Sequence, residues 1–95
     1  MDAQQVSEFQ FAGQDIPGLL AHWAEAKPGH PFLIWEPRTG TGRQWSYRQF
    51  REDVRSVAAG LHARGVVTGD RILIHAENCP EMVLAWYACA ELGAV

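Results

Sequence analysis

The stretch that decides the fold runs from residue 71 to residue 95 and reads RILIHAENCPEMVLAWYACAELGAV. It opens with a strand-like run, Arg71–His75, and continues with an apolar helix-like run, Pro80–Leu92. Gly93-Ala94-Val95 then has the character of a helix stop followed by the first two residues of another strand. Strand, helix and strand make a βαβ crossover, the repeating unit of parallel sheets. The stretch therefore predicts an α/β protein.

This crossover is incomplete, because a parallel strand normally continues for four residues or more and is buried on both faces. We expect the chain to be the front piece of a larger α/β enzyme. We also expect an exposed apolar strand edge near Ala94 and Val95. The helix from Pro80 is apolar almost all round, which predicts that both of its sides are covered.

Two elements, a helix and a β-hairpin, are expected in the first half of the chain. Asp15 is a candidate N-cap for a helix that carries Pro17 in its first turn and must end before Pro28. Short β-type runs at 32–35 and 43–45 flank a Gly/Thr-rich turn and predict a β-hairpin.

The clearest helix follows the hairpin. Ser46 and Gln49 form an S-x-x-Q capping box, and Gly65 supplies a residue that can end the helix in the left-handed conformation. Between them, apolar residues recur at steps of three and four and form one stripe: Tyr47, Phe50, Val54, Val57 and Leu61.

Composition is that of an ordinary globular protein, with 95 residues, 47% hydrophobic, 20% charged and a net charge of -3. No basic excess indicates a nucleic-acid partner. The first 14 residues, expected to be a flexible arm, lack the basic and apolar regions of an export signal, and no segment is long enough to span a membrane. Cys79 and Cys89 lie too far apart on one helix for a disulfide, which favours free thiols and a cytoplasmic location.

Candidate chemistry is weak throughout. Gly40-Thr41-Gly42 suggests a phosphate loop, but the third glycine of that fingerprint would fall at Trp45, so a hairpin turn is favoured. His75-Ala76-Glu77 matches half of a zinc deaminase motif, yet Cys79-Pro80 has the reverse order of the other half. We expect His75 to be a hydrogen-bonded structural residue instead.

Other polar residues also favour structural roles. His22 and Glu25 share a helix face, whereas His30 and His62 stand alone; an acid–base role would need a positioned partner, so solvated or capping roles are favoured. Arginines at 48, 51, 55 and 64 are interleaved with Glu52 and Asp53, which is typical of a mixed solvated helix face. The sequence therefore assigns no catalytic, cofactor-binding or metal-binding residue, and the segment builds a scaffold.

A resemblance rests on the order and spacing of short motifs between residues 14 and 95. In chain order they are Ile16-Pro17-Gly18-Leu19-Leu20, Phe32-Leu33-Ile34-Trp35, Trp45-Ser46-Tyr47, Ala58-Ala59-Gly60-Leu61, Gly65-Val66, Gly69-Asp70-Arg71-Ile72, Asn78-x-Pro80-Glu81 and Gly93-Ala94-Val95. This series resembles the N-terminal segment of the AMP-forming acyl-CoA synthetases. Trp35, Trp45 and the Cys79-Pro80 junction look more like the small-acid and carnitine-type or medium-chain members.

The resemblance implies that residues 15–95 are the start of a large N-terminal AMP-binding domain, truncated. It implies an acid–thiol ligase that uses ATP, Mg²⁺ and coenzyme A: a carboxylic acid becomes an acyl-adenylate and is then transferred to the thiol. The family's phosphate loop, nucleotide-binding segments and catalytic lysine have no counterpart here, so we expect this segment to bind none of these molecules and to be inactive alone.

Two alternatives stay open at this point. The parent could be a peptide-synthetase adenylation domain that loads an amino acid onto a carrier protein. The chain could also be a stand-alone small α/β interaction module.

Overall fold

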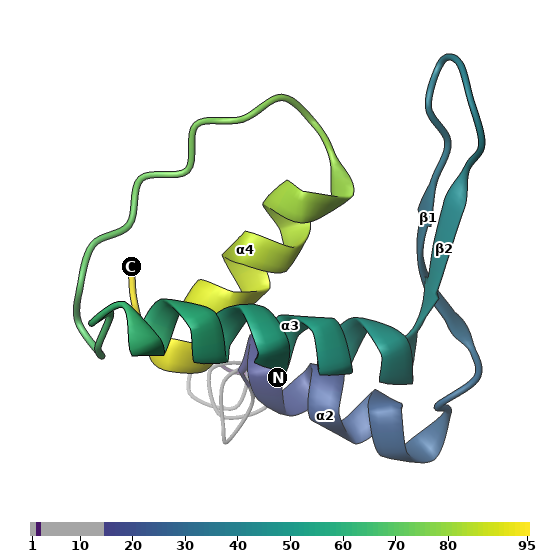
Figure 1. The fold of residues 1–95 in the computed structure, drawn as a ribbon. Helices are drawn as coiled ribbons and strands as arrows, with labels where there is room; N and C mark the ends of the chain where they lie inside the picture. The colour runs from purple at the N-terminus through teal and green to yellow at the C-terminus, as the bar shows by residue number, and fades with distance from the viewer. Residues whose placement is uncertain (1, 3–14) are drawn as a thin grey trace.

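The structure, a computed structural model, describes Asp2 and residues 15–95. The rest of the expected arm at 1–14 lies outside the described residues. These described residues form three helices and one hairpin, in chain order α2 (Ile16–Ala26), β1 (Pro31–Trp35), β2 (Arg43–Ser46), α3 (Tyr47–Ala63) and α4 (Pro80–Leu92). Figure 1 shows α2 and α3 lying alongside each other, α4 crossing them, and the hairpin standing away from the end where α3 begins.

Helix α2 begins and ends as the sequence predicts. The Asp15 carboxylate accepts a hydrogen bond from the Gly18 N–H at 2.6 Å, and a proline stands in the first turn. The helix ends at Ala26, and the N–H of the C-cap residue Lys27 donates to the Trp23 carbonyl. At the start of the helix, the Asp15 carboxylate satisfies one of the four N–H groups that would otherwise lack a partner.

The predicted hairpin is confirmed, with each strand one residue longer than expected. Strands β1 and β2 pair antiparallel, with Trp35 opposite Arg43, and the register is irregular between Pro31 and Leu33. Gly40 has a φ of 94° in the turn, a conformation that favours glycine.

Helix α3 has the predicted capping box. The Gln49 N–H donates to the Ser46 hydroxyl at 3.2 Å, and the Ser46 N–H donates to the Gln49 side chain at 3.0 Å. The N–H groups of Tyr47 and Arg48 donate to the carbonyls of His30 and Pro28. The start of α3 is therefore fixed to the loop that precedes the hairpin.

The core lies where α2, α4 and the hairpin meet α3. Its central residues are Leu20, Trp45, Phe50 and Val54, all buried. Phe50 is fully buried, at 0% exposure. The predicted stripe of α3 is the part of the chain that the other elements cover.

The prediction of a strand at Arg71–His75 is wrong, because no strand forms there. The described residues contain one sheet, the two-stranded hairpin. In residues 70–74 the pairing with Val95 consists of two hydrogen bonds: Ile72 N–H to the Val95 carbonyl and Val95 N–H to the Asp70 carbonyl, both 2.7 Å. A ladder needs several residues on each strand, and here one residue faces the extended segment.

Helix α4 starts with Pro80 in its first turn and ends at Gly93, whose φ is 74°. The prediction that both sides of α4 are covered is wrong, because Trp86 is 60% exposed. The predicted apolar edge is confirmed: Leu73 is 91% and Val95 79% exposed. Within Asp2 and residues 15–95, no helix combines the length and apolar character that crossing a bilayer requires.

Candidate functional site

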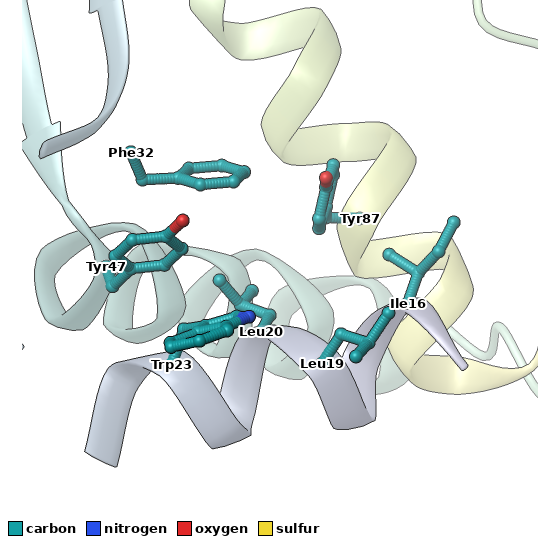
Figure 2. Close-up of a pocket in the computed structure, with 7 residues that line it drawn as sticks. All are labelled: Ile16, Leu19, Leu20, Trp23, Phe32, Tyr47 and Tyr87. Carbon is teal, nitrogen blue, oxygen red and sulfur yellow. The ribbon is translucent and has the colours of Figure 1, made fainter. Parts of the chain in front are cut away.

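An aromatic hollow lies between α2, α3, α4 and strand β1. Figure 2 shows its lining side chains gathered around one open space: Ile16, Leu19, Leu20, Trp23, Phe32, Tyr47 and Tyr87. The volume is about 140 Å³. The four contributing elements lie far apart in sequence, so the hollow is a product of the tertiary fold.

Phe32 is the centre of the aromatic contacts around this hollow. Its ring lies 4.7 Å from Phe50, 5.1 Å from Tyr47 and 5.8 Å from Tyr87, measured between centroids. Phe50 and Tyr87 meet edge to face at 5.2 Å. Tilted and edge-to-face arrangements of this kind are the favoured ones for aromatic pairs. The rings therefore join β1, α3 and α4.

The described side chains that line this hollow are uncharged at neutral pH. Burial raises the pKa of Tyr87 above its usual value of 10.0, and the nearby Tyr47 hydroxyl raises this pKa further. Both phenols can donate or accept hydrogen bonds, and among the described residues the lining holds no carboxylate, imidazole, amine or thiol. The two phenols are therefore the described lining groups of a type that takes part in acid–base or nucleophilic chemistry.

Size also limits what this hollow can hold. A cavity of roughly 150 Å³ accommodates a benzene-sized molecule, whereas pockets for cofactors span roughly 300–1,000 Å³. A nucleotide is far larger than the space about 140 Å³ provides. The hollow is a gap in helix packing with room for a small apolar group.

A polar network on the hairpin side connects β2 to α3 and α4. The Arg43 guanidinium donates to the Glu81 carboxylate at 2.8 Å and stacks 4.6 Å from the Trp45 ring. The Trp45 indole N–H donates to the Asp53 carboxylate at 2.9 Å. The pKa of Glu81 is lowered, first by its own backbone N–H at the start of α4 and then by Arg43.

Sequence reasoning missed this network, since Arg43 and Glu81 lie 38 positions apart. The one signal was the placement of Glu81 in the first turn of α4, where a helix favours negative charge. Every charged group in the network has a protein partner. Its function is therefore structural.

The suspected phosphate loop is a hairpin turn. Gly40 takes a left-handed conformation, and a Cβ at Gly42 would lie 2.8 Å from the Trp35 carbonyl oxygen. These two glycines are thus explained by the turn itself. The N–H groups at the start of α3 are also occupied, by Ser46 and by carbonyls of residues 28 and 30.

The suspected metal-binding residues do not come together. Within residues 15–95 and Asp2, no three His, Cys, Asp or Glu side chains are close enough to share an ion. His75 and Glu77 are exposed. The prediction that His75 is hydrogen-bonded is wrong, because its ring makes no hydrogen bond within the described residues. Cys79 and Cys89 are free thiols, as predicted.

The other polar candidates have structural surroundings. His22 packs edge-on against Trp23, and His30 Nδ1 lies 2.8 Å from the Pro31 carbonyl. On α3, Arg48 pairs with Glu52 one turn away at 3.5 Å, which agrees with a mixed solvated face. No catalytic constellation forms among the described residues.

Comparison with known proteins identifies where this scaffold recurs. A family model described as AMP-binding enzyme matches residues 20–95. A crotonobetaine/carnitine–CoA ligase of Salmonella paratyphi A is 34% identical over 83 residues, which cover 87% of this chain and 16% of that ligase. The chain thus spans about a sixth of the length of this curated relative.

Solved structures agree with the sequence match. Acetoacetyl-CoA synthetase from Streptomyces lividans has a TM-score of 0.76 and 32% identity, over 83% of this chain and 12% of that chain. The fatty acid AMP ligase from Legionella pneumophila has a TM-score of 0.78 at 20% identity, over 83% of this chain and 14% of that one. The second likeness concerns the fold alone.

Proposed function

The chain belongs to the AMP-binding enzyme family, and we propose that residues 15–95 form the start of the large N-terminal domain of an ATP-dependent, AMP-forming acyl-CoA ligase. The observation that carries this proposal is the match over residues 20–95, together with a shared backbone in a CoA synthetase at 32% identity. The relatives' names favour coenzyme A over a carrier protein as the acyl acceptor.

The proposed reaction has two steps. An oxygen of the substrate carboxylate attacks the α-phosphorus of ATP, and pyrophosphate leaves to give an acyl-adenylate. The thiol of coenzyme A then attacks the acyl carbonyl, a thioester forms, and AMP leaves with the bonding electrons. Adenylation replaces a poor leaving group with a good one, so stabilising charge on the phosphates is the central catalytic task.

The substrate is proposed to be a small carboxylic acid, in line with the crotonobetaine/carnitine–CoA ligases among the relatives. We propose a cytoplasmic enzyme, because both cysteines are free thiols. Mg²⁺ would serve the phosphates in such an enzyme, but the described residues offer no fitting set of ligands.

The role proposed for residues 15–95 is to build and brace the domain. Support comes from the aromatic cluster, the two capped helix starts and the Arg43–Glu81 bridge, all of which hold elements together. The aromatic hollow is too small for a nucleotide and holds no charged group. We therefore propose that this segment alone binds neither ATP nor coenzyme A.

A chimera tests this proposal. Residues 20–95 would replace the matching segment of the Salmonella ligase, and ATP–pyrophosphate exchange would be measured with crotonobetaine or carnitine. We expect the rate of exchange to be clearly above that of a second chimera that also carries Phe50→Ala, because this variant lacks the buried centre of the scaffold. A soluble chimera with no exchange would contradict the proposal.

A further inference from the structure

The aromatic hollow is walled by rings that form a cage. Four aromatic side chains, one from each surrounding element, make up this aromatic cage: Trp23, Phe32, Tyr47 and Tyr87. Figure 2 shows Phe32 and Trp23 on opposite sides of the open space, with the two tyrosines at its flanks. Ring centroids lie 5.1 Å apart for Phe32 and Tyr47, 5.8 Å for Phe32 and Tyr87, and 6.4 Å for Trp23 and Tyr47. The planes of these pairs are inclined by 37° to 76°, so neighbouring rings meet at an angle instead of stacking.

The cage is open to solvent along α2. Trp23 is 38% and Leu19 45% exposed, whereas Leu20 beside them is buried. A ligand can therefore enter from the α2 side. The volume of about 140 Å³ is close to the roughly 150 Å³ that takes up a benzene-sized molecule. A tetramethylammonium ion has fewer heavy atoms than benzene and fits this space.

The charge distribution of the rings favours a cation in the cage. Each aromatic ring has a negative face and a positive edge. Several faces around one space attract a cation together, and aromatic cages bind quaternary ammonium ions in this way. Trp23 already attracts a cation, because the Lys27 ammonium lies 5.5 Å from the centroid of its ring. Lys27 is not among the described residues that line the hollow, so its ammonium does not fill the cage.

The polar atoms of the described lining select among charged ligands. They are the two phenol hydroxyls and the Trp23 indole N–H, which can only donate a hydrogen bond. A primary ammonium group has three N–H donors and would exchange its hydration for few acceptors. A quaternary ammonium has no N–H and loses no hydrogen bond on entry. An anion would meet the negative ring faces and no cationic side chain of the described lining.

We propose that the aromatic cage is a binding site for a trimethylammonium group. The methyl groups carry the spread positive charge and contact the ring faces together with the aliphatic side chains of α2. Because the described lining holds no carboxylate to pair with the charge, we expect a dissociation constant in the low millimolar range. Neither step of the ligase reaction involves this site, so it does not depend on the proposed function.

Titration of the chain with tetramethylammonium chloride and with choline chloride, at constant ionic strength, tests the proposal. Binding is followed by the NMR signal of the Trp23 indole N–H. The comparison ligand is the neutral alcohol in which a carbon atom replaces the choline nitrogen, since it has the same shape without the charge. We expect choline to bind about tenfold more tightly than this neutral alcohol.

Variants of Trp23 separate ring faces from apolar volume. Trp23→Leu keeps an apolar side chain but removes one wall, and choline affinity should fall about fivefold or more. Trp23→Phe restores a ring and should recover part of the loss. The matched control is Trp86→Leu, an exposed tryptophan outside the described lining, which should leave choline affinity unchanged. Lys27→Met removes a nearby like charge and should raise choline affinity about twofold. Circular dichroism of each variant should match that of the wild type.

Two sources can supply the trimethylammonium group, a small free molecule or a trimethylated lysine side chain. A short peptide that contains trimethyllysine is therefore titrated beside choline, with the unmethylated peptide as its control. Tighter binding of the methylated peptide than of choline identifies a protein ligand, and weaker or equal binding identifies a small molecule. Either result supports the cage.

Three results would overturn the inference. These are no saturable shift with choline or tetramethylammonium at millimolar concentration, binding of the neutral alcohol as tight as that of choline, or wild-type choline affinity in a folded Trp23→Leu chain. Loss of ATP–pyrophosphate exchange in the chimera, by contrast, concerns the proposed function alone.

Discussion

Truncation of Phe50 tests whether the aromatic cluster is the core that holds the three helices together. The side chain is fully buried and contacts the rings of Phe32 at 4.7 Å and Tyr87 at 5.2 Å. Removing a buried phenylalanine costs about 3–5 kcal/mol, from lost transfer free energy and the cavity left behind. A chain of 95 residues can have a stability of only about 5 kcal/mol. Phe50→Ala should therefore leave a free energy of unfolding of only about 0–2 kcal/mol.

Phe50→Leu gives a graded measurement. Leucine keeps most of the apolar volume but loses both ring contacts, each worth about 0.5–1.5 kcal/mol. Urea unfolding, followed by tryptophan fluorescence, should show a free energy of unfolding lower by about 1–3 kcal/mol. The control is Ile34→Ala, an exposed site where the change should stay within about 0.5 kcal/mol. The reasoning is refuted if Phe50→Ala costs no more than Ile34→Ala.

Three further predictions concern local features of the fold. Ser46→Ala removes the α3 cap and should lower the free energy of unfolding by about 1 kcal/mol in the same urea assay; an unchanged midpoint would contradict the capping role. Gly93→Ala should cost about 1–2 kcal/mol, because φ is +74° and a Cβ would meet the Thr68 methyl at 3.0 Å. Gly60 lies inside α3 with open space around it, so Gly60→Ala should instead raise the free energy of unfolding by about 0.5–1 kcal/mol. Equal effects at the two glycines would contradict the roles given to both. The raised pKa of Tyr87 means that the neutral phenol favours the folded state, so its contribution is complete below pH 10.0 and falls as pH rises above it. Tyr87→Phe should remove this part of the pH dependence, measured as the difference in unfolding free energy from wild type at about pH 9 and about pH 11; a constant difference would be the contrary result.

Local signals predicted most of the elements. Asp15, Ser46 and Gly93 mark helix ends through hydrogen bonds and backbone conformations that depend on a few neighbouring residues. The two β-type runs around the glycine-rich turn predicted the hairpin, because that pairing is also local. The resemblance then placed these elements in the family that the comparisons support.

What the sequence could not predict depends on contacts between distant residues. Arg43 and Glu81 form a bridge across 38 positions, and no local pattern pairs them. A strand was predicted at 71–75 because its residue types suit a sheet, but strand structure also requires neighbouring strands to pair with, so none forms there. Trp86 was expected to be covered for the same reason: an apolar helix indicates burial but not what buries it.

The aromatic hollow was equally hidden, since its walls come from α2, α3, α4 and β1. The ordered apolar stripe of α3 indicated only that something packs there. That residues 15–95 act as a scaffold without catalytic residues stays a prediction.

Calorimetric titration of this chain with ATP and Mg²⁺ tests most directly whether the segment is scaffold without a nucleotide site. We predict no saturable heat, because the aromatic hollow is too small for a nucleotide and the larger hollow beside Ile72 and Ile74 has no charged residue in its described lining to hold phosphates. Saturable binding at micromolar concentration would contradict this claim.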